Sequence, residues 1–304
     1  MTTNTIATQT MKDEREHPLP EVQDFRCLER LRVRWAEVDL QKIVFNGHYL
    51  MYFDTAVAAY WRMLAMPYHE AMHLLQGDLY VRKATLEYEA SAQYDDQLHI
   101  GMRTQRLGKS SMTMQACAFK GDRRLVHGEI VYVFADPHTQ TSRPIPDALR
   151  RWIEAFEAGE SMVNVKTAVG AELLTDAQPL RHQVFTQEQG VSEQIEQDGR
   201  DDQALHAVAY NRLQQAVGTA RMLFTGDGEA QIGRMAVLPT VRGAGVGRAM
   251  LQALIDGARL QGCRSVMLHA QSAVIPFYLS EGFSVESEEY LEAGIRHRTM
   301  RKAI

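Results

Sequence analysis

The chain has 304 residues, of which 45% are apolar, and a formal net charge of -5 at pH 7. This length favours two domains, and the small negative charge, evenly spread over both halves, argues against nucleic acid as a partner. Three widely separated cysteines and the lack of any long apolar run argue against metal sites, disulfides, a secretory leader and membrane spans. We therefore expect a cytoplasmic globular protein with no metal and no membrane contact, preceded by a disordered N-terminus over 1–20.

The first half of the sequence combines one long helical pattern with several strand patterns. A strand pattern around 27–35 leads through a polar loop to a helix over 47–66, with apolar residues at helical spacing (Leu50, Phe53, Val57, Tyr60, Trp61 and Leu64). Turn residues separate further strands predicted over 81–88, 99–106, 111–119 and 125–135, which predicts an antiparallel meander. A short helix over 147–157 and a small, polar boundary at 158–161 complete this half.

The second half reads as a mixed α/β unit. It is expected to open with a strand over 162–169 and a helix over 176–189. Next come three strands, over 205–210, 215–225 and 231–238, and then a glycine-rich loop. The loop is followed by a helix over 247–260, a strand over 265–269, a helix over 275–281 and a terminal strand pair.

The glycine-rich loop between a predicted strand and a predicted helix is the strongest signal in this half. Such a loop presents free backbone N–H groups to phosphate, and glycine lets the backbone approach the oxygens closely. Its spacing fits neither the Gly-Lys-Ser/Thr ending of a P-loop nor the Gly-x-Gly-x-x-Gly of dinucleotide-binding folds. A turn without a ligand remains the alternative.

The motif Arg242-x-x-Gly245-x-Gly247 resembles the pyrophosphate loop of the GNAT N-acetyltransferases, most closely the ElaA-type branch. Flanking blocks at 233–239, 269–271, 276–283 and 294–297 are similar in the same order, so the resemblance covers about 162–304. It implies a GNAT fold that binds acetyl-CoA or another acyl-CoA through Val237, Arg242, Gly243, Ala244, Gly245, Val246, Gly247 and Arg248. Tyr278 stands where many relatives hold the acid that reprotonates the departing CoA thiolate, whereas Gln271 and Val274 replace their usual Asn and Ala.

The acceptor of the acyl group is suggested only by an acidic stretch over 188–202, which contains six acids and one base, Arg200. Its negative potential could attract an amine, which is one interpretation; a solvated surface is the other. Glu188 and His206 are candidate bases.

The other informative stretch, 35–49, places Asp39 and Asn46 before the long helix. By itself this pattern is typical of helix capping. However, Arg34-x4-Asp39-x3-Ile43-Val44-Phe45, with blocks at 106–111 and 139–146, resembles the hotdog thioesterases of the 4-hydroxybenzoyl-CoA type over about 22–157. The resemblance implies an antiparallel sheet wrapped on a long helix, with Asp39 as the catalytic carboxylate and Asn46 as a donor to the thioester oxygen. Lys42 replaces the usual glycine, and it could pair with Asp39 or contact a CoA phosphate.

Together these patterns predict a two-domain α+β and α/β protein, with a hotdog domain over 21–158 and a GNAT domain over 162–304. The expected function is bifunctional: hydrolysis of an acyl-CoA thioester, and acyl transfer from CoA to an amine acceptor. The alternative is an acyl-CoA-binding or regulatory protein in which one domain is inactive. The hotdog resemblance also implies a homodimer or homotetramer formed through the first domain.

Overall fold

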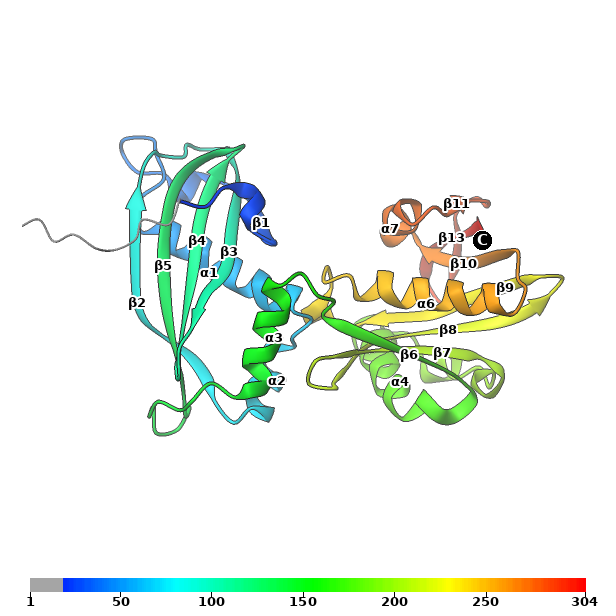
Figure 1. Cartoon of the computed structure of the whole chain (residues 1–304). Coiled ribbons are helices and arrows are strands. Elements are labelled where there is room, and N and C mark those ends of the chain that lie inside the picture. Colours follow the sequence, from blue (N-terminus) through cyan, green and yellow to red (C-terminus); the bar gives the residue numbers. More distant parts are fainter. Residues whose placement is uncertain (1–18) are drawn as a thin grey trace, which may run out of the picture.

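The computed structural model describes residues 19–304, and the predicted disordered N-terminus over 1–20 falls almost wholly on residues outside this range. Two separate sheets, each with its own helices, divide the described chain into two domains (Figure 1). This confirms the two-domain fold class, while the limits 21–158 and 162–304 remain a prediction. No helix in the described residues is both long enough and apolar enough to cross a membrane.

The N-terminal sheet is antiparallel, with strand order β1-β3-β4-β5-β2. Its strands are β1 (Cys27–Arg32), β2 (Asp78–Tyr88), β3 (Gln97–Leu107), β4 (Ser111–Lys120) and β5 (Arg123–Ala135). The predicted meander is correct for β3, β4 and β5 but wrong for β2, which pairs with β5. The reason is that β1 occupies the free edge of β3, pairing Cys27 with Met102 and Leu31 with Leu98, so β2 takes the opposite edge of the sheet.

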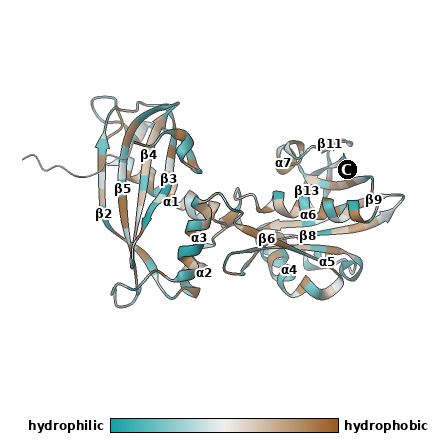
Figure 2. Ribbon diagram, viewed as in Figure 1, coloured by the Kyte–Doolittle hydropathy of each residue, from teal (hydrophilic) through white to brown (hydrophobic). Residues whose placement is uncertain are grey.

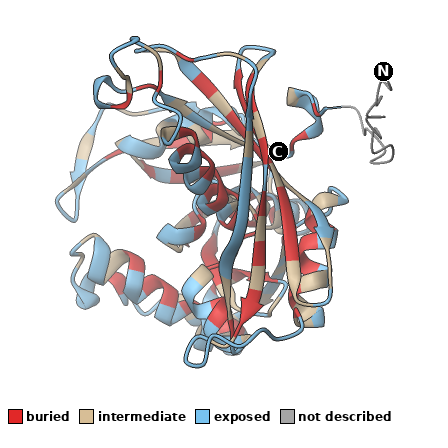
Figure 3. Ribbon diagram, turned by 90° about the vertical axis from the view of Figure 1, so that its left-hand side faces the viewer, coloured by how far each residue is buried: buried red, intermediate tan, exposed pale blue. Residues whose placement is uncertain are grey.

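Helix α1 (His48–Met63) lies against this sheet, and buried residues recur along it (Figure 3). Most of the predicted stripe is buried, with Phe53, Tyr60 and the C-cap Leu64 fully covered. Leu50 is the exception and is exposed. Helix α3 (Asp147–Glu157) has the predicted bounds, whereas α2 (Tyr68–Leu74) was not expected. The strand expected to reach Trp35 ends at Arg32, because Trp35–Glu37 forms a 3-10 turn, η2.

The C-terminal sheet has the order β11-β13-β10-β9-β8-β7-β6, with β12 on β13. Its strands are β6 (Val163–Val169), β7 (Leu205–Asn211), β8 (Ala216–Gly226), β9 (Glu229–Val237), β10 (Ser265–Gln271), β11 (Ser284–Val285), β12 (Tyr290–Glu292) and β13 (Ile295–Ala303). The helices are α4 (Leu174–Arg181), α5 (Glu193–Glu196), α6 (Val246–Leu260) and α7 (Ile275–Ser280). The predicted helix over 176–189 is wrong in type beyond Arg181, where the chain continues as a π-helix, η4 (His182–Glu188).

Strands β9 and β10 are parallel neighbours that separate partway along their length. Their pairing runs from Ser265 opposite Glu229 to Leu268 opposite Ile232. Beyond that point β9 continues to Val237 and β10 to Gln271 without pairing to each other. Arg234, with φ of 51°, lies where β9 also slips its register against β8. The sheet therefore opens between these two strands at their carboxyl ends.

The two domains share a buried junction at the C-terminal end of α1. The backbone carbonyl of Ala65 accepts a hydrogen bond from the Asn211 side chain at 3.3 Å, and Asn211 is 2% exposed. Helix α1 also approaches the 3-10 turn η6 (Pro239–Val241), which leads into the glycine-rich loop. Apolar residues, brown in Figure 2, recur along both sheets, and most of the buried ones form one cluster that spans the junction, with two smaller clusters apart from it.

Candidate functional site

Asp39 lies in a tight turn ahead of α1. Its backbone carbonyl accepts the Lys42 N–H at 2.9 Å, and its side-chain Oδ1 accepts the Gln41 N–H at 2.8 Å. The N-cap of α1 is Gly47, so the interpretation of Asp39 as a helix cap is wrong. The other carboxylate oxygen has no hydrogen-bond partner among residues 19–304, and the side chain is only half-buried. The turn thus holds Asp39 by one oxygen and leaves the other open for chemistry.

Lys42 adopts a left-handed backbone conformation, with φ of 63°, and its side chain is exposed. Glycine adopts this conformation without a steric cost, which gives a physical reason for the glycine expected here from the family resemblance. No ion pair joins Lys42 to Asp39 in the described structure, so the expected pairing is not observed. The departure at Lys42 therefore places a residue with a Cβ in a backbone conformation that favours glycine.

Asn46 is exposed and directly precedes the N-cap of α1. Its backbone carbonyl accepts a hydrogen bond from the Tyr88 hydroxyl at 3.1 Å, while its side-chain amide makes none with residues 19–304. The amide therefore remains available as a donor on the same loop as Asp39.

Glu37 anchors this loop, although the sequence reasoning did not single it out. It is 3% exposed and accepts hydrogen bonds from the Arg34 backbone N–H (2.7 Å), the Arg34 Nε–H (2.6 Å) and the Tyr52 hydroxyl (2.7 Å). Burial opposes its ionisation, but these hydrogen bonds together with the Arg34 charge hold the pKa of Glu37 below its ordinary value. The spacing of Arg34 and Glu37 by three residues was the available sequence signal.

The glycine-rich loop runs into the N-terminus of α6. Gly243 and Gly245 both have left-handed backbones, with φ of 91° and 80°, and Gly245 is the N-cap of the helix. The first backbone N–H groups of an α-helix have no intrahelical partner. At the start of α6 these groups belong to Val246, Gly247 and Arg248. Together with the helix dipole they form a site suited to an anion.

Two ion pairs flank this loop. Arg242 donates to the Glu188 carboxylate through both terminal nitrogens at 2.6 Å, and its Nε donates to the Val237 carbonyl at 3.1 Å. Arg248 pairs with Glu281 at 2.6 Å. Arg242 therefore connects the end of β9 to the end of the π-helix η4.

Tyr278 extends from α7 towards β9. Its hydroxyl donates to the Met235 sulfur at 3.4 Å, and burial raises the pKa of Tyr278 to about 12, so the phenol is neutral at physiological pH. On the other side of the opening, the Gln271 amide donates to the Gln189 side chain at 3.0 Å. The structure thus brings a neutral proton donor to the opening between β9 and β10.

The acidic stretch over 188–202 is largely neutralised by arginines from elsewhere in the chain. Arg181 of α4 bonds Glu196 and Asp201, and Arg221 of β8 bonds Asp198 and Asp201. Arg234 of β9 lies 3.3 Å from Asp198. Of these three acids only Glu196 is buried, so a solvated surface is wrong for Glu196, whereas Asp198 is exposed. The attraction of an amine by this stretch stays a prediction.

His206 is also part of this buried region. It is 1% exposed, and its Nε2 lies 2.9 Å from the Asp201 carbonyl. This position removes it from the exposed candidates for a base, whereas Glu188 remains on the surface.

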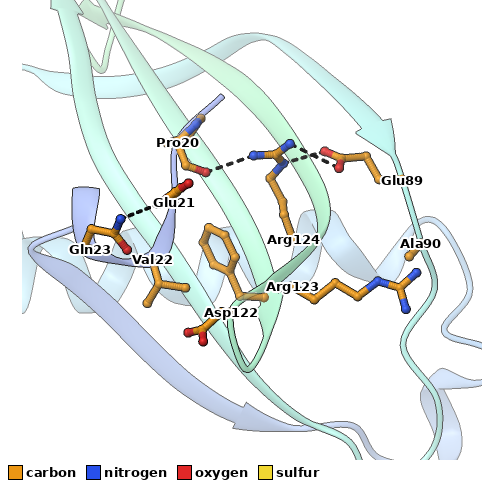
Figure 4. Close-up of a pocket in the computed structure, with 10 residues that line it drawn as sticks. Pro20, Glu21, Val22, Gln23, Glu89, Ala90, Asp122, Arg123 and Arg124 are labelled. Atoms are coloured by element: carbon orange, nitrogen blue, oxygen red, sulfur yellow. Dashed lines mark hydrogen bonds and ion pairs between the residues drawn. The ribbon is translucent and has the colours of Figure 1, made fainter. Parts of the chain in front are cut away.

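A cavity of about 620 Å³ lies elsewhere, between the N-terminal segment at 20–23 and the β4–β5 hairpin (Figure 4). Within it, Arg124 bonds the Glu89 carboxylate and the Pro20 carbonyl. The cavity contains none of the predicted site residues. Within residues 19–304 there is also no group of three or more His, Cys, Asp or Glu side chains arranged to hold a metal ion.

Comparison with known proteins matches each half separately. Residues 166–304 match the family model described as an acetyltransferase (GNAT) domain, and residues 41–127 match the thioesterase superfamily model. The uncharacterized N-acetyltransferase YjcF of Bacillus subtilis is 38% identical over 136 residues, which cover 44% of this chain and 96% of that relative.

Solved structures similar to this chain include two thioesterases. The BH1999 gentisyl-coenzyme A thioesterase is 22% identical, covering 41% of this chain and 98% of its own, with a TM-score of 0.38. The DHNA-CoA thioesterase of Staphylococcus aureus is 16% identical, covering 43% and 89%, with a TM-score of 0.39. From these matches, the chain belongs to the GNAT acetyltransferase family through residues 166–304, while residues 41–127 match the thioesterase superfamily model.

Proposed function

We propose that the chain is a bifunctional enzyme that acts on CoA thioesters, transferring an acyl group to an amine in its C-terminal domain and hydrolysing acyl-CoA in its N-terminal domain. The observation that supports the proposal is a neutral buried phenol, Tyr278, on the Met235 side chain of β9, in a sheet whose neighbouring helix α6 begins with a glycine loop suited to an anion. We also propose a cytoplasmic location.

In the acyltransferase half, the CoA pyrophosphate would bind the backbone N–H groups at 245–248 together with Arg242. The acyl-thioester end would enter the opening between β9 and β10. The neutral amine nitrogen attacks the thioester carbonyl carbon, the carbon–sulfur bond breaks, and the thiolate takes the Tyr278 hydroxyl proton. The proton that the amine nitrogen loses as the amide forms returns through solvent to the Tyr278 phenolate. A neutral phenol suits this step because a leaving thiolate needs a donor that is still protonated.

In the thioesterase half, the open oxygen of Asp39 would either attack the thioester carbonyl or accept a proton from the attacking water. The Asn46 amide would donate to the carbonyl oxygen as negative charge develops there. Because the turn holds Asp39 through Oδ1, the carboxylate needs little reorganisation during the reaction.

We also propose that this half assembles as a dimer or tetramer. Apolar side chains on the Asp39 loop are strongly exposed: Trp35 by 75%, Leu40 by 103% and Phe45 by 52%. Strand β2 is an edge of its sheet with largely exposed residues. An uncovered apolar loop beside an open strand edge favours pairing with a second copy. A monomeric mass by light scattering at micromolar concentration would contradict this.

The thioesterase assignment is tested by following release of free CoA thiol from a panel of acyl-CoAs without an amine. Asp39→Asn keeps the oxygen that accepts the Gln41 N–H and removes the charge, so the fold should persist while hydrolysis falls by ~100-fold or more. Asp39→Ala is the matched control that loses both the charge and the turn contact. If Asp39→Asn hydrolyses at the wild-type rate, the carboxylate only supports the turn.

The CoA site is tested with two glycines at opposite ends of α6. Gly245 and Gly262 have similar left-handed backbones (φ of 80° and 76°), and an added Cβ would meet no other atom within 4 Å at either. Gly245→Ala and Gly262→Ala therefore impose comparable strain, but only the first disturbs the proposed phosphate site. We expect calorimetric CoA affinity to fall only in Gly245→Ala; equal affinities in the two variants would refute the assignment.

If neither domain releases free CoA thiol from any acyl-CoA, with or without amines, the result would favour the alternative of an acyl-CoA-binding or regulatory protein.

A further inference from the structure

The ion pair between Arg242 and Glu188 holds an arginine of the proposed CoA loop against a carboxylate of the π-helix η4. Both terminal nitrogens of Arg242 donate to Glu188, one to each oxygen, at 2.6 Å. The two residues are 54 positions apart, so the contact joins two segments that the chain brings together only on folding. The Arg242 charge and its hydrogen bonds hold the pKa of Glu188 below its ordinary value, so Glu188 is ionised at neutral pH.

The Arg242 guanidinium has little capacity left for a second two-pronged partner. A guanidinium binds a carboxylate or phosphate best through two parallel N–H groups. The edge formed by its two terminal nitrogens is used by Glu188, and on the other edge Nε already donates to the Val237 carbonyl at 3.1 Å. A diphosphate that is to be held by a pair of N–H groups must therefore displace one of these partners.

Glu188 is the partner that can be displaced at least cost. The Arg242 and Glu188 side chains are 44% and 37% exposed, and ion pairs at such exposure contribute only about 0–1 kcal/mol. A diphosphate carries more negative charge and more acceptor oxygens than one carboxylate, and the N-terminus of α6 attracts it further.

We infer that Glu188 occupies the diphosphate-binding edge of Arg242 as an internal carboxylate, and that CoA displaces it on binding. This inference rests on the proposed placement of CoA on loop 242–248. Once displaced, Glu188 becomes an unpaired carboxylate next to Gln189, whose side chain contacts Gln271 at the opening between β9 and β10.

The experiment compares CoA binding to the full-length wild type, Glu188→Gln and Glu193→Gln by titration calorimetry. Glu193→Gln is the matched control: it removes the same charge from a nearby exposed carboxylate whose partner is His182. Removal of the internal competitor should tighten CoA binding by about two- to fivefold in Glu188→Gln. Glu193→Gln should show a smaller change, and Glu188→Ala should show a gain at least as large as Glu188→Gln.

A second probe, S-acetylpantetheine, isolates the diphosphate, since it carries the thioester but no phosphate. It should bind the wild type and Glu188→Gln equally. Weaker or unchanged CoA binding in Glu188→Gln, or an equal gain with S-acetylpantetheine, would overturn the inference and leave the CoA site itself intact. Failure of the wild type to bind CoA would instead overturn the proposed function on which the inference depends.

Discussion

Replacing Lys42 with glycine should stabilise the protein, because Lys42 is a non-glycine residue with a left-handed backbone (φ of 63°). That conformation costs a residue with a Cβ about 1–2 kcal/mol, and glycine removes the cost. Glycine also gains conformational freedom in the unfolded chain, which offsets about 0.5–1 kcal/mol of the benefit. The expected net gain is about 0.5–1 kcal/mol, which for domains of this size corresponds to a rise in Tm of about 1–4 °C.

The assay is thermal unfolding followed by circular dichroism, with Lys42→Ala as the control. Alanine removes the ammonium group but keeps the Cβ, so it should leave Tm nearly unchanged. Because no ion pair joins Lys42 to Asp39 in the described structure, neither variant should change the rate of acyl-CoA hydrolysis by more than about twofold. A stabilisation of Lys42→Ala equal to that of Lys42→Gly would refute the backbone argument, and a lower Tm for Lys42→Gly would refute it outright.

Three further substitutions test other parts of the structure. Tyr278→Phe removes the proposed proton donor, a hydroxyl whose contact is the Met235 sulfur. The rate of amine acylation should therefore fall at least ~10-fold, while Tm and CoA affinity hardly change. An unchanged rate would make Tyr278 a packing residue. Arg181→Met leaves the buried Glu196 without its hydrogen-bonded cation and removes one of the two arginines that bond Asp201, so it should cost about 3–5 kcal/mol in urea unfolding, whereas a loss below about 1 kcal/mol would contradict the role assigned to the network. Burial raises the pKa of Glu157 above its unfolded value, so the wild type loses stability as pH rises through the folded pKa. Glu157→Gln should therefore have the higher Tm at pH 8, with the advantage shrinking towards pH 4; a pH-independent difference would contradict this.

Features set by local sequence were predicted well. Helix α3 was placed at its observed bounds, and α6 within one residue of them, because their apolar spacing defines one buried face. The glycine loop before α6 was also found from local sequence, since glycines between a strand and a helix impose the left-handed turns seen at Gly243 and Gly245. Asp39 and Tyr278 were proposed mainly from family resemblance, and their catalytic roles remain predictions.

Features set by distant partners could not be predicted. The acids at 196, 198 and 201 looked unpaired along the chain because Arg181, Arg221 and Arg234 come from three other elements. The pairing of β2 with β5 likewise depends on β1 returning to the edge of β3. Neither arrangement has a signature within a short window of sequence, since the contacts form only when the elements assemble.

The buried junction at the end of α1 limits how the two domains can be separated or moved. Helix α1 has 16 residues and is about 24 Å long; the Asp39 turn lies ahead of its start, and its far end meets the C-terminal domain (Figure 1). Asn211, bonded to Ala65, fastens that end, and Arg212, bonded to Glu160 and Ser161, holds the segment between the domains. If the two domains were separated after cleavage at Gly159, the buried junction would become exposed to solvent. Each domain would then need new polar residues on that surface to remain soluble alone. The same fastening prevents residues 158–162 from acting as a swinging arm between the two domains.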